Sequence, residues 1–200
     1  DITAGQLVKP FEDDTAVFAD ICNSEDYVYA MTVDGSLYSS NDGRNFDLVS
    51  DADGLSEAQR IACVNGSVLA TYSDGSLKVF SNGTGYDLDA VFDTHDLRII
   101  SDSDTLIAVT SDNEFYTTSN GYIFSALDMS SVIGEGTVIT DADCSQGRFC
   151  FLTEGGKVIV VDKTADAETE IDEIDISSVE PKDLVLSSEG KIIVVTSDRK

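Results

Sequence analysis

The stretch Val28-Tyr-Ala-Met-Thr-Val-Asp-Gly-Ser-Leu37 decides the fold, because the chain repeats it. It combines an apolar run, an Asp-Gly turn and the start of a second run, which is the pattern of a tight β-hairpin. It returns as Val68-Leu-Ala-Thr-Tyr-Ser-Asp-Gly-Ser-Leu77 and Leu106-Ile-Ala-Val-Thr-Ser-Asp-Asn-Glu-Phe115, and more loosely from Phe149 and from Ile192. The copies begin 40, 38, 43 and 43 residues apart, a period typical of β-propeller blades.

Other short β runs accompany each copy. In the first repeat they cover 17–22, 37–40 and 46–49. Four antiparallel strands joined by tight turns form one propeller blade, and a run that is apolar on both faces suits a strand packed between two neighbours. The sequence therefore predicts an all-β, five-bladed β-propeller of four-stranded antiparallel blades. A β-sandwich is the alternative, because its strands and turns have similar spacing.

The repeats divide the whole chain, which we treat as one propeller domain. The expected blades cover roughly 16–55, 56–95, 96–135, 136–180, and 181–200 together with 1–15. The last repeat stops where its third strand should begin, and Ile2–Ala4 and Leu7–Phe11 have the composition of the missing strands. We therefore expect N-terminal and C-terminal strands to close the last blade together, which removes exposed strand edges. A fragment of a larger ring is the alternative.

One turn of the first repeat carries a family resemblance. It reads Ser40-Asn-Asp-Gly-Arg-Asn-Phe46 and resembles the Asp-box, or BNR, repeat of sialidase-like propellers, Ser-x-Asp-x-Gly-x-Thr-Trp. It is one residue shorter and has Phe in place of Trp. The segments Ser81–Tyr86 and Ser119–Phe124 keep the Ser, Gly and aromatic residues but lose the Asp. The resemblance implies a propeller and a structural turn, and likeness of fold does not transfer activity.

The charge of the chain excludes one class of partner. It has 12 Lys and Arg against 38 Asp and Glu, a formal net charge of −26. Nucleic-acid binding needs cationic contacts to phosphate, so nucleic acid is excluded as a main partner. Apolar runs such as 158–161 and 192–195 are far shorter than the roughly 20 residues of a membrane helix. We therefore expect no membrane insertion.

No catalytic motif is recognisable, so we expect no enzymatic activity. Sialidases bind a carboxylate with three arginines, whereas this chain has five arginines in all and no Phe-Arg-Ile-Pro segment. Its one histidine, His95, lies in an acidic loop between repeats. Pairs of carboxylates as in glycosidases arise by chance among so many acids, and no nucleophile triad or phosphate loop is present. A glycoside hydrolase-like enzyme is the alternative.

Alignment of the inner strands predicts a channel pocket. Arg60 and Arg98 take equivalent positions, Asp141 matches them in the next blade, and Asp20 and Asp143 lie nearby. Charged residues on an innermost strand must face the channel, since a packed blade interface would desolvate them. We expect these five residues to line one mouth of the channel, unless they form only structural ion pairs.

The four cysteines allow two disulfides and require none. Cys22, Cys63 and Cys144 share one column of the same alignment, where small side chains would also pack well near the axis. A Cys22–Cys63 bond is possible only if neighbouring strands bring their Cα atoms within about 7 Å. Cys144 and Cys150 flank a hairpin turn and are the second candidate pair.

The sequence also suggests a metal site and two glycosylation sites. The loop that begins at Asp51 and Asp53 opens like a calcium loop, with Glu57 as a further candidate ligand. It lacks the third acid and the twelve-residue length of such a loop. Calcium is the one cofactor that the sequence suggests. Asn65 and Asn82 lie in glycosylation sequons, which are also explained as Asn-Gly turns.

These observations favour a secreted or surface-displayed propeller without enzymatic activity. We expect it to serve as a structural or protein-interaction module, whose partner is another protein or a second copy of the chain. A lectin-like propeller that binds glycans is the alternative. It would require equivalent aromatic residues in each blade, and Phe46, Tyr86 and Phe124 do recur.

Overall fold

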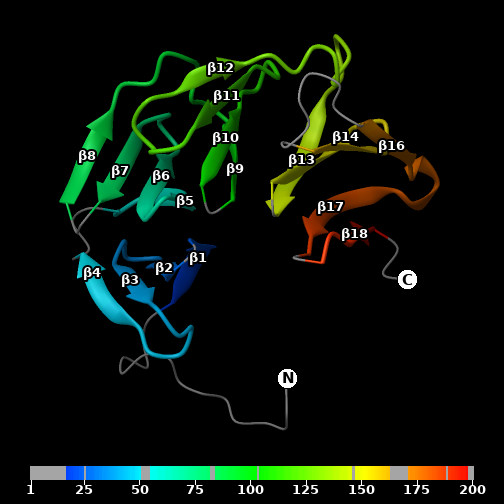
Figure 1. Cartoon of the computed structure of the whole chain (residues 1–200). Coiled ribbons are helices and arrows are strands. Elements are labelled where there is room, and N and C mark those ends of the chain that lie inside the picture. Colours follow the sequence, from blue (N-terminus) through cyan, green and yellow to red (C-terminus); the bar gives the residue numbers. More distant parts are fainter. Residues whose placement is uncertain are drawn as a thin grey trace, which may run out of the picture.

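Figure 1 shows the chain as a computed structural model. It describes residues 17–24, 26–50, 55–81, 84–102, 104–145, 147–162, 171–187 and 189–197. The regular elements of these residues are β-strands and one 3-10 helix, Ser177–Val179. No helix in this part of the chain has the length and apolar character needed to cross a membrane.

The strands form five antiparallel sheets, which we number along the chain. Sheet 1 contains β1 (Phe18–Asn23), β2 (Val28–Thr32), β3 (Leu37–Ser40) and β4 (Asp47–Ser50). Sheet 2 contains β5 (Ala58–Val64), β6 (Ser67–Tyr72), β7 (Leu77–Ser81) and β8 (Thr84–Leu88). Sheet 3 contains β9 (Arg98–Asp102), β10 (Thr105–Val109), β11 (Phe115–Thr118) and β12 (Ser125–Leu127). Sheet 4 contains β13 (Ile139–Ser145), β14 (Arg148–Thr153), β15 (Lys157–Asp162) and β16 (Ile171–Asp175). Sheet 5 contains β17 (Pro181–Leu186) and β18 (Ile192–Thr196).

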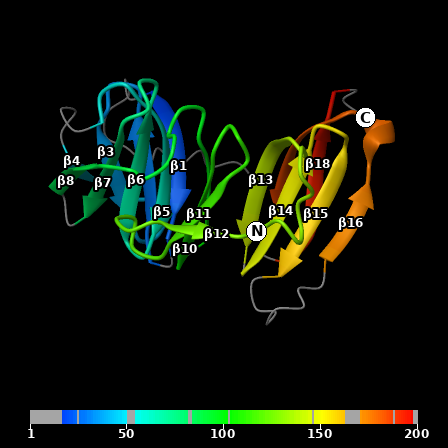
Figure 2. The same ribbon diagram turned by 90° about the horizontal axis from the view of Figure 1, so that it is seen from above.

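Each sheet follows the chain without a crossover, so that successive strands are hydrogen-bonded neighbours. The first strand of each sheet contacts the first strand of the next, in the order β1, β5, β9, β13 and β17. Figure 1 shows the sheets following one another around an arc, with sheets 1 and 5 at its two ends. In Figure 2, turned by 90°, sheets 4 and 5 stand beside sheets 1 to 3. The predicted all-β architecture is confirmed, and so are the four antiparallel strands of sheets 1 to 4, whereas sheet 5 has two strands among the described residues.

The core lies between the sheets. Separate apolar clusters join sheets 1 and 2, 2 and 3, 3 and 4, and 4 and 5. Met31, Leu69 and Phe151, each on the second strand of its sheet, are fully buried. Burial on both faces explains why β6 and β10 carry apolar residues on both faces of the strand. A sandwich of two layers, the alternative that the sequence left open, would have one core between two sheets.

The Asp-Gly turns fix the hairpins that the repeat predicts. Gly35 has φ of +89°, and a side chain there would collide with the backbone of Leu55 and Ser56. Only glycine fits both the conformation and the close approach. The predicted closing strands Ile2–Ala4 and Leu7–Phe11 lie outside the described residues.

Candidate functional site

Five charged residues occupy one register position on the inner strands, and we call them the charged column. The column consists of Asp20, Arg60, Arg98, Asp141 and Asp183. Their partners on the second strand of each sheet are, in the same order, Met31, Thr71, Val109, Leu152 and Val195. In every sheet except the third, a β-bulge immediately precedes the charged residue. A bulge redirects the side chain that follows it, which suits a charged group that must avoid the packed faces.

The structure places four of the predicted channel residues in this column and adds a fifth. Asp20, Arg60, Arg98 and Asp141 belong to it, whereas Asp143 lies two residues further along β13. Sequence reasoning missed Asp183. The inner hairpin of sheet 5 pairs Leu186 with Ile192, one residue further apart than the equivalent pair in sheet 4, and this offset shifted the alignment.

A small cavity connects three members of the column. Arg60, Arg98 and Asp141 line a space of about 190 Å³ together with Thr71 and Thr140. The two arginines also line an adjoining, wider groove of about 760 Å³, whose other walls are Gln59, Asp96, Leu97, Ser111 and Val138. Asp20 and Asp143 do not line the cavity. The two arginines therefore stand where the groove meets the cavity.

Two carboxylates fasten one sheet to the next. Asp20 Oδ2 accepts a hydrogen bond of 2.9 Å from the N–H of Ile61 and lies 3.5 Å from Arg60 Nε. Asp102 Oδ2 accepts a bond of 2.7 Å from the N–H of Gly147. These bonds to a charged acceptor run from an inner strand to an inner strand (Ile61) or to the turn that follows one (Gly147) in the neighbouring sheet, so the acids have a structural role.

Sheet 4 is fastened to sheet 5 in the same way. Asp141 Oδ2 accepts from the N–H of Leu184, and Asp143 Oδ2 accepts from the N–H of Leu186, each at 2.7 Å. Asp143 therefore accepts a hydrogen bond that joins sheets 4 and 5, and it lines neither the cavity nor the groove. Asp141 is both an acceptor between sheets and a wall of the cavity.

The pKa of Asp141 is raised from an ordinary value of 3.8 to about 6, first by burial and then by a hydrogen bond with the carboxyl group of Asp183. Repulsion between the two carboxylates acts in the same direction, while the N–H of Leu184 favours the charged form. The carboxyl group of Asp141 therefore holds its proton to a higher pH than an ordinary Asp does.

Asp141→Asn should make the folded protein more stable near neutral pH. Since native Asp141 holds its proton at higher pH than the unfolded chain does, the free energy of unfolding falls as pH rises from about 4 to 6. Asn keeps an acceptor for Leu184 and carries no charge. The residue is partly exposed and solvent screens it, so we expect a gain of about 1 kcal/mol at pH 7 and none at pH 4. Urea unfolding at both pH values measures it.

Asp47→Asn is the matched control, because Asp47 is exposed on β4 and removal of its charge tests only the reduction in total charge. An equal gain from Asp47→Asn, or a gain from Asp141→Asn that does not depend on pH, would contradict the assignment.

Cys22 and Cys63 form a disulfide, with their Cα atoms 5.8 Å apart, and it joins sheets 1 and 2. This candidate pair is confirmed. Cys22 pairs with Tyr29 and Cys63 with Val68, so the two cysteines lie one register position apart. The offset is required, because residues that meet between two stacked sheets must come from opposite faces of their strands.

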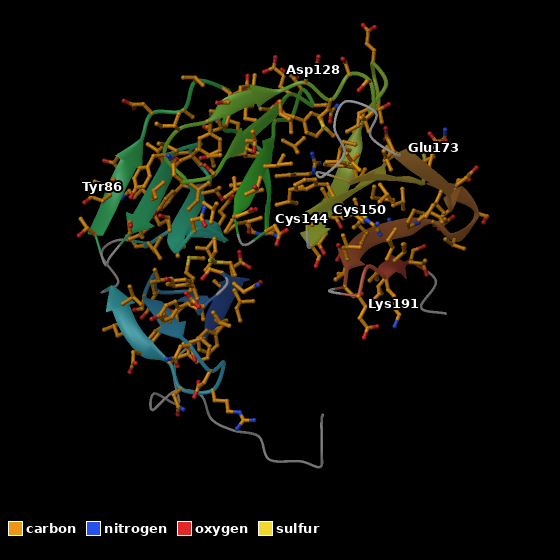
Figure 3. All side chains as sticks on the ribbon, viewed as in Figure 1. Tyr86, Asp128, Cys144, Cys150, Glu173 and Lys191 are labelled. Carbon is orange, nitrogen blue, oxygen red and sulfur yellow. A yellow bond between two sulfur atoms is a disulfide. The ribbon has the colours of Figure 1, made fainter. Side chains whose placement is uncertain are left out.

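The second candidate pair is wrong, since Cys144 and Cys150 form no disulfide. Both are buried in sheet 4, where Figure 3 labels them. Cys144 lies opposite Phe149, and Cys150 lies opposite Asp143. Directly opposed residues share a face, so adjacent positions place the two thiols on opposite faces. Accordingly Cys144 packs in the core toward sheet 3 and Cys150 in the core toward sheet 5.

The metal and glycan hypotheses gain no structural support. Asp51, Asp53 and Asn82 lie outside the described residues, and Glu57 occupies a turn with φ of +72°. In the part of the chain that the structure describes, no group of three acids, cysteines or histidines is placed to hold a metal. Asn65 begins an Asn-Gly turn, and its Nδ2 donates a 2.7 Å bond to the carbonyl of Ser119 in sheet 3.

The Asp-box-like turn has the hydrogen bonds of a structural motif. Asp42 Oδ1 accepts from the N–H groups of Arg44 and Asn45, both at 2.8 Å, and from Ser40 Oγ at 2.9 Å. The bond from Asn45 N–H is the largest cause of a pKa of Asp42 far below its usual value. The turn thus uses its acid for local structure.

The equivalent turn of sheet 3 keeps this arrangement with an amide. Asn120 Oδ1 accepts from the N–H groups of Tyr122 and Ile123 at 2.8 and 2.9 Å, and from Thr118 Oγ1 at 3.1 Å. The loss of Asp therefore costs the turn no acceptor. The aromatic residues Phe46 and Phe124 follow these two turns and are partly buried. The equivalent residue of sheet 2, Tyr86, is half-exposed; Figure 3 labels it.

No family of protein sequences matches the chain, and no curated protein matches it. Solved β-propellers match its structure. They include human WBSCR16 (TM-score 0.62, 13% identity, 87% of this chain) and YCF48 bound to D1 peptide (0.58, 11%, 92%). A chain of the nidogen/laminin complex matches at TM-score 0.56 with 14% identity over 92% of this chain and 73% of its own. The chain spans 56% of WBSCR16 and 62% of YCF48. These likenesses show the fold.

Proposed function

We propose that the chain is a non-enzymatic β-propeller that works outside the cell, secreted or on the cell surface, and binds a protein partner at one end of its channel. The observation that carries the proposal is the groove and cavity between the inner strands, where Arg60 and Arg98 line both spaces. Convergent polar groups at a concave surface are typical of binding sites.

Two further observations support the proposal. The Cys22–Cys63 disulfide suits an oxidising compartment, because the cytosol keeps thiols reduced. Among the structural neighbours, YCF48 was solved with a peptide and another neighbour belongs to the nidogen/laminin complex. Propellers of this shape thus serve as platforms for polypeptide partners.

In this proposal the two ends of the chain together form the fifth blade, which completes the ring. The two ends of the row expose apolar side chains that need a cover, Phe18 and Ile21 on β1 and Ile193 and Val195 on β18. The N-terminal residues 1–15 would supply the outer strands beside β18. Asp183 would then fasten sheet 5 to sheet 1, as Asp20 fastens sheet 1 to sheet 2.

Amide hydrogen exchange tests the closure. In the full chain the outward N–H groups of β18 should be protected, and deletion of residues 1–15 should remove that protection while β10 keeps its own. Equal exchange of β18 with and without the N-terminal residues would contradict the closure: equal protection would mean that another segment or a second copy covers this edge, and equally fast exchange would mean that the edge is open.

Affinity capture tests the function. The oxidised protein would be immobilised and exposed to secreted and surface proteins of its source, beside the triple variant Arg60→Gln, Arg98→Gln, Asp141→Asn. A protein retained by the parent and lost from the folded variant supports the proposal. An identical set on both columns, or turnover of chromogenic glycosides by the purified protein, would overturn it.

A further inference from the structure

The charged column holds two arginines and three acids, and apart from Asp20 the residues of like charge are neighbours. Arg60 and Arg98 follow one another on β5 and β9, and Asp141 and Asp183 follow on β13 and β17. Arg98 forms no ion pair with any described residue, although it shares a cavity with Asp141. The arginine and the acid are thus kept apart with a space between them.

The charges of the column are only partly neutralised by contacts among its own residues. Arg60 meets Asp20 only at 3.5 Å and leaves 76% of its side chain exposed. On the other side, the carboxyl groups of Asp141 and Asp183 are hydrogen-bonded to each other, and neither forms an ion pair with a Lys or Arg among the described residues. A ligand that brings a carboxylate to the arginines and a cation to the acids would relieve both conditions.

The shape of the site indicates where such a ligand continues. The cavity of about 190 Å³ admits a single residue, and the groove of about 760 Å³ leads from it along Gln59, Asp96 and Ser111. A chain end in the cavity with the preceding residues in the groove uses both spaces. The terminal residue of a polypeptide is also the one place where a backbone carboxylate and a side-chain cation belong to the same residue.

Resting on the proposed function, we propose that the partner is recognised by a C-terminal lysine or arginine. Its α-carboxylate lies between the guanidinium groups of Arg60 and Arg98, and its side-chain cation lies against Asp141 and Asp183. The paired N–H donors of an arginine suit a carboxylate. A cation between the two acids attracts both and offsets their repulsion for each other.

Fluorescence anisotropy with short peptides tests this assignment in 150 mM salt. The probe is fluorescein-Gly-Gly-Gly-Lys with a free carboxylate, beside its C-terminal amide and a peptide that ends in norleucine. We expect the free lysine peptide to bind at least about tenfold more tightly than either control. The amide is the more cationic peptide, so simple attraction to a chain of charge −26 predicts the opposite order.

Matched variants locate the site. Arg98→Gln should weaken the lysine peptide about tenfold or more, and Asp183→Asn should remove the preference for lysine over norleucine. Arg44→Gln, in an exposed turn of sheet 1, should change nothing. Circular dichroism confirms folding of each variant. Equal binding of the acid and the amide, or binding unaffected by Arg98→Gln, would overturn the assignment.

The same data separate this inference from the function on which it rests. A captured protein that depends on Arg60 and Arg98, together with peptides that show no preference for the terminal lysine, would leave the interaction module standing and reject the ligand. Absence of both would reject both.

Discussion

Reduction of the Cys22–Cys63 disulfide should lower the free energy of unfolding by about 4 kcal/mol. The bond joins residues 41 positions apart, and a cross-link of that span removes chain entropy from the unfolded state by roughly that amount. Urea unfolding with and without a reductant that leaves the buried thiols unchanged gives the difference directly. Cys22→Ser should reproduce the loss and make the protein insensitive to the reductant.

The other cysteines provide the control for this experiment. Cys144→Ser leaves the disulfide intact, so the variant should keep the full response to the reductant, whatever it loses from its own core contact. If the parent unfolds at the same urea concentration in both conditions, the bond between sheets 1 and 2 contributes nothing. The support that it lends to an extracellular location would then be lost as well.

The repeat predicted the strands because their causes are local. Apolar runs, Asp-Gly turns and a regular period place β2, β6 and β10 where the structure has them. The bonds between sheets could not be found in this way. Asp20 reaches Ile61 and Asp102 reaches Gly147 across more than 40 residues, and only the stacking of sheets brings these groups together.

Register decided which site predictions were correct. Each cysteine assignment depended on which face of a strand a residue occupies, and a shift of one position reverses that face. The observed register brings Cys22 next to Cys63 and places Cys144 and Cys150 on opposite faces of sheet 4. The same shift hid Asp183, because one extra residue in a hairpin is invisible until the pairing is known.

The hydrogen bonds of a turn can also survive a change of residue type between repeats. Sequence comparison counted the turn at Asn120 as a loss of the Asp-box acid. The structure shows that Asn120 accepts from two backbone N–H groups and a hydroxyl, as Asp42 does. The turn needs an oxygen acceptor, and an amide oxygen meets that need as a carboxylate does.

Phe151→Ala should cost about 3 to 5 kcal/mol of stability, the range for loss of a large side chain from a close-packed core. Phe151 on β14 is fully buried, and its ring meets the edge of Phe115 on β11 at a centroid distance of 5.5 Å and an interplanar angle of 86°. Because the rings belong to sheets 4 and 3, the pair measures how firmly neighbouring sheets are packed. Val91→Ala, at a residue 79% exposed, should cost under about 0.5 kcal/mol.

The double variant decides whether the loss comes from the interface. If sheets 3 and 4 stack as described, Phe115→Ala and Phe151→Ala should be non-additive by about 1 kcal/mol, since either change alone already removes the ring contact. Additive costs would mean that each ring is buried within its own sheet. The cavity at Arg60 and Arg98 lies between inner strands that this stacking helps to hold in place, so additivity would also weaken the geometric basis for that cavity.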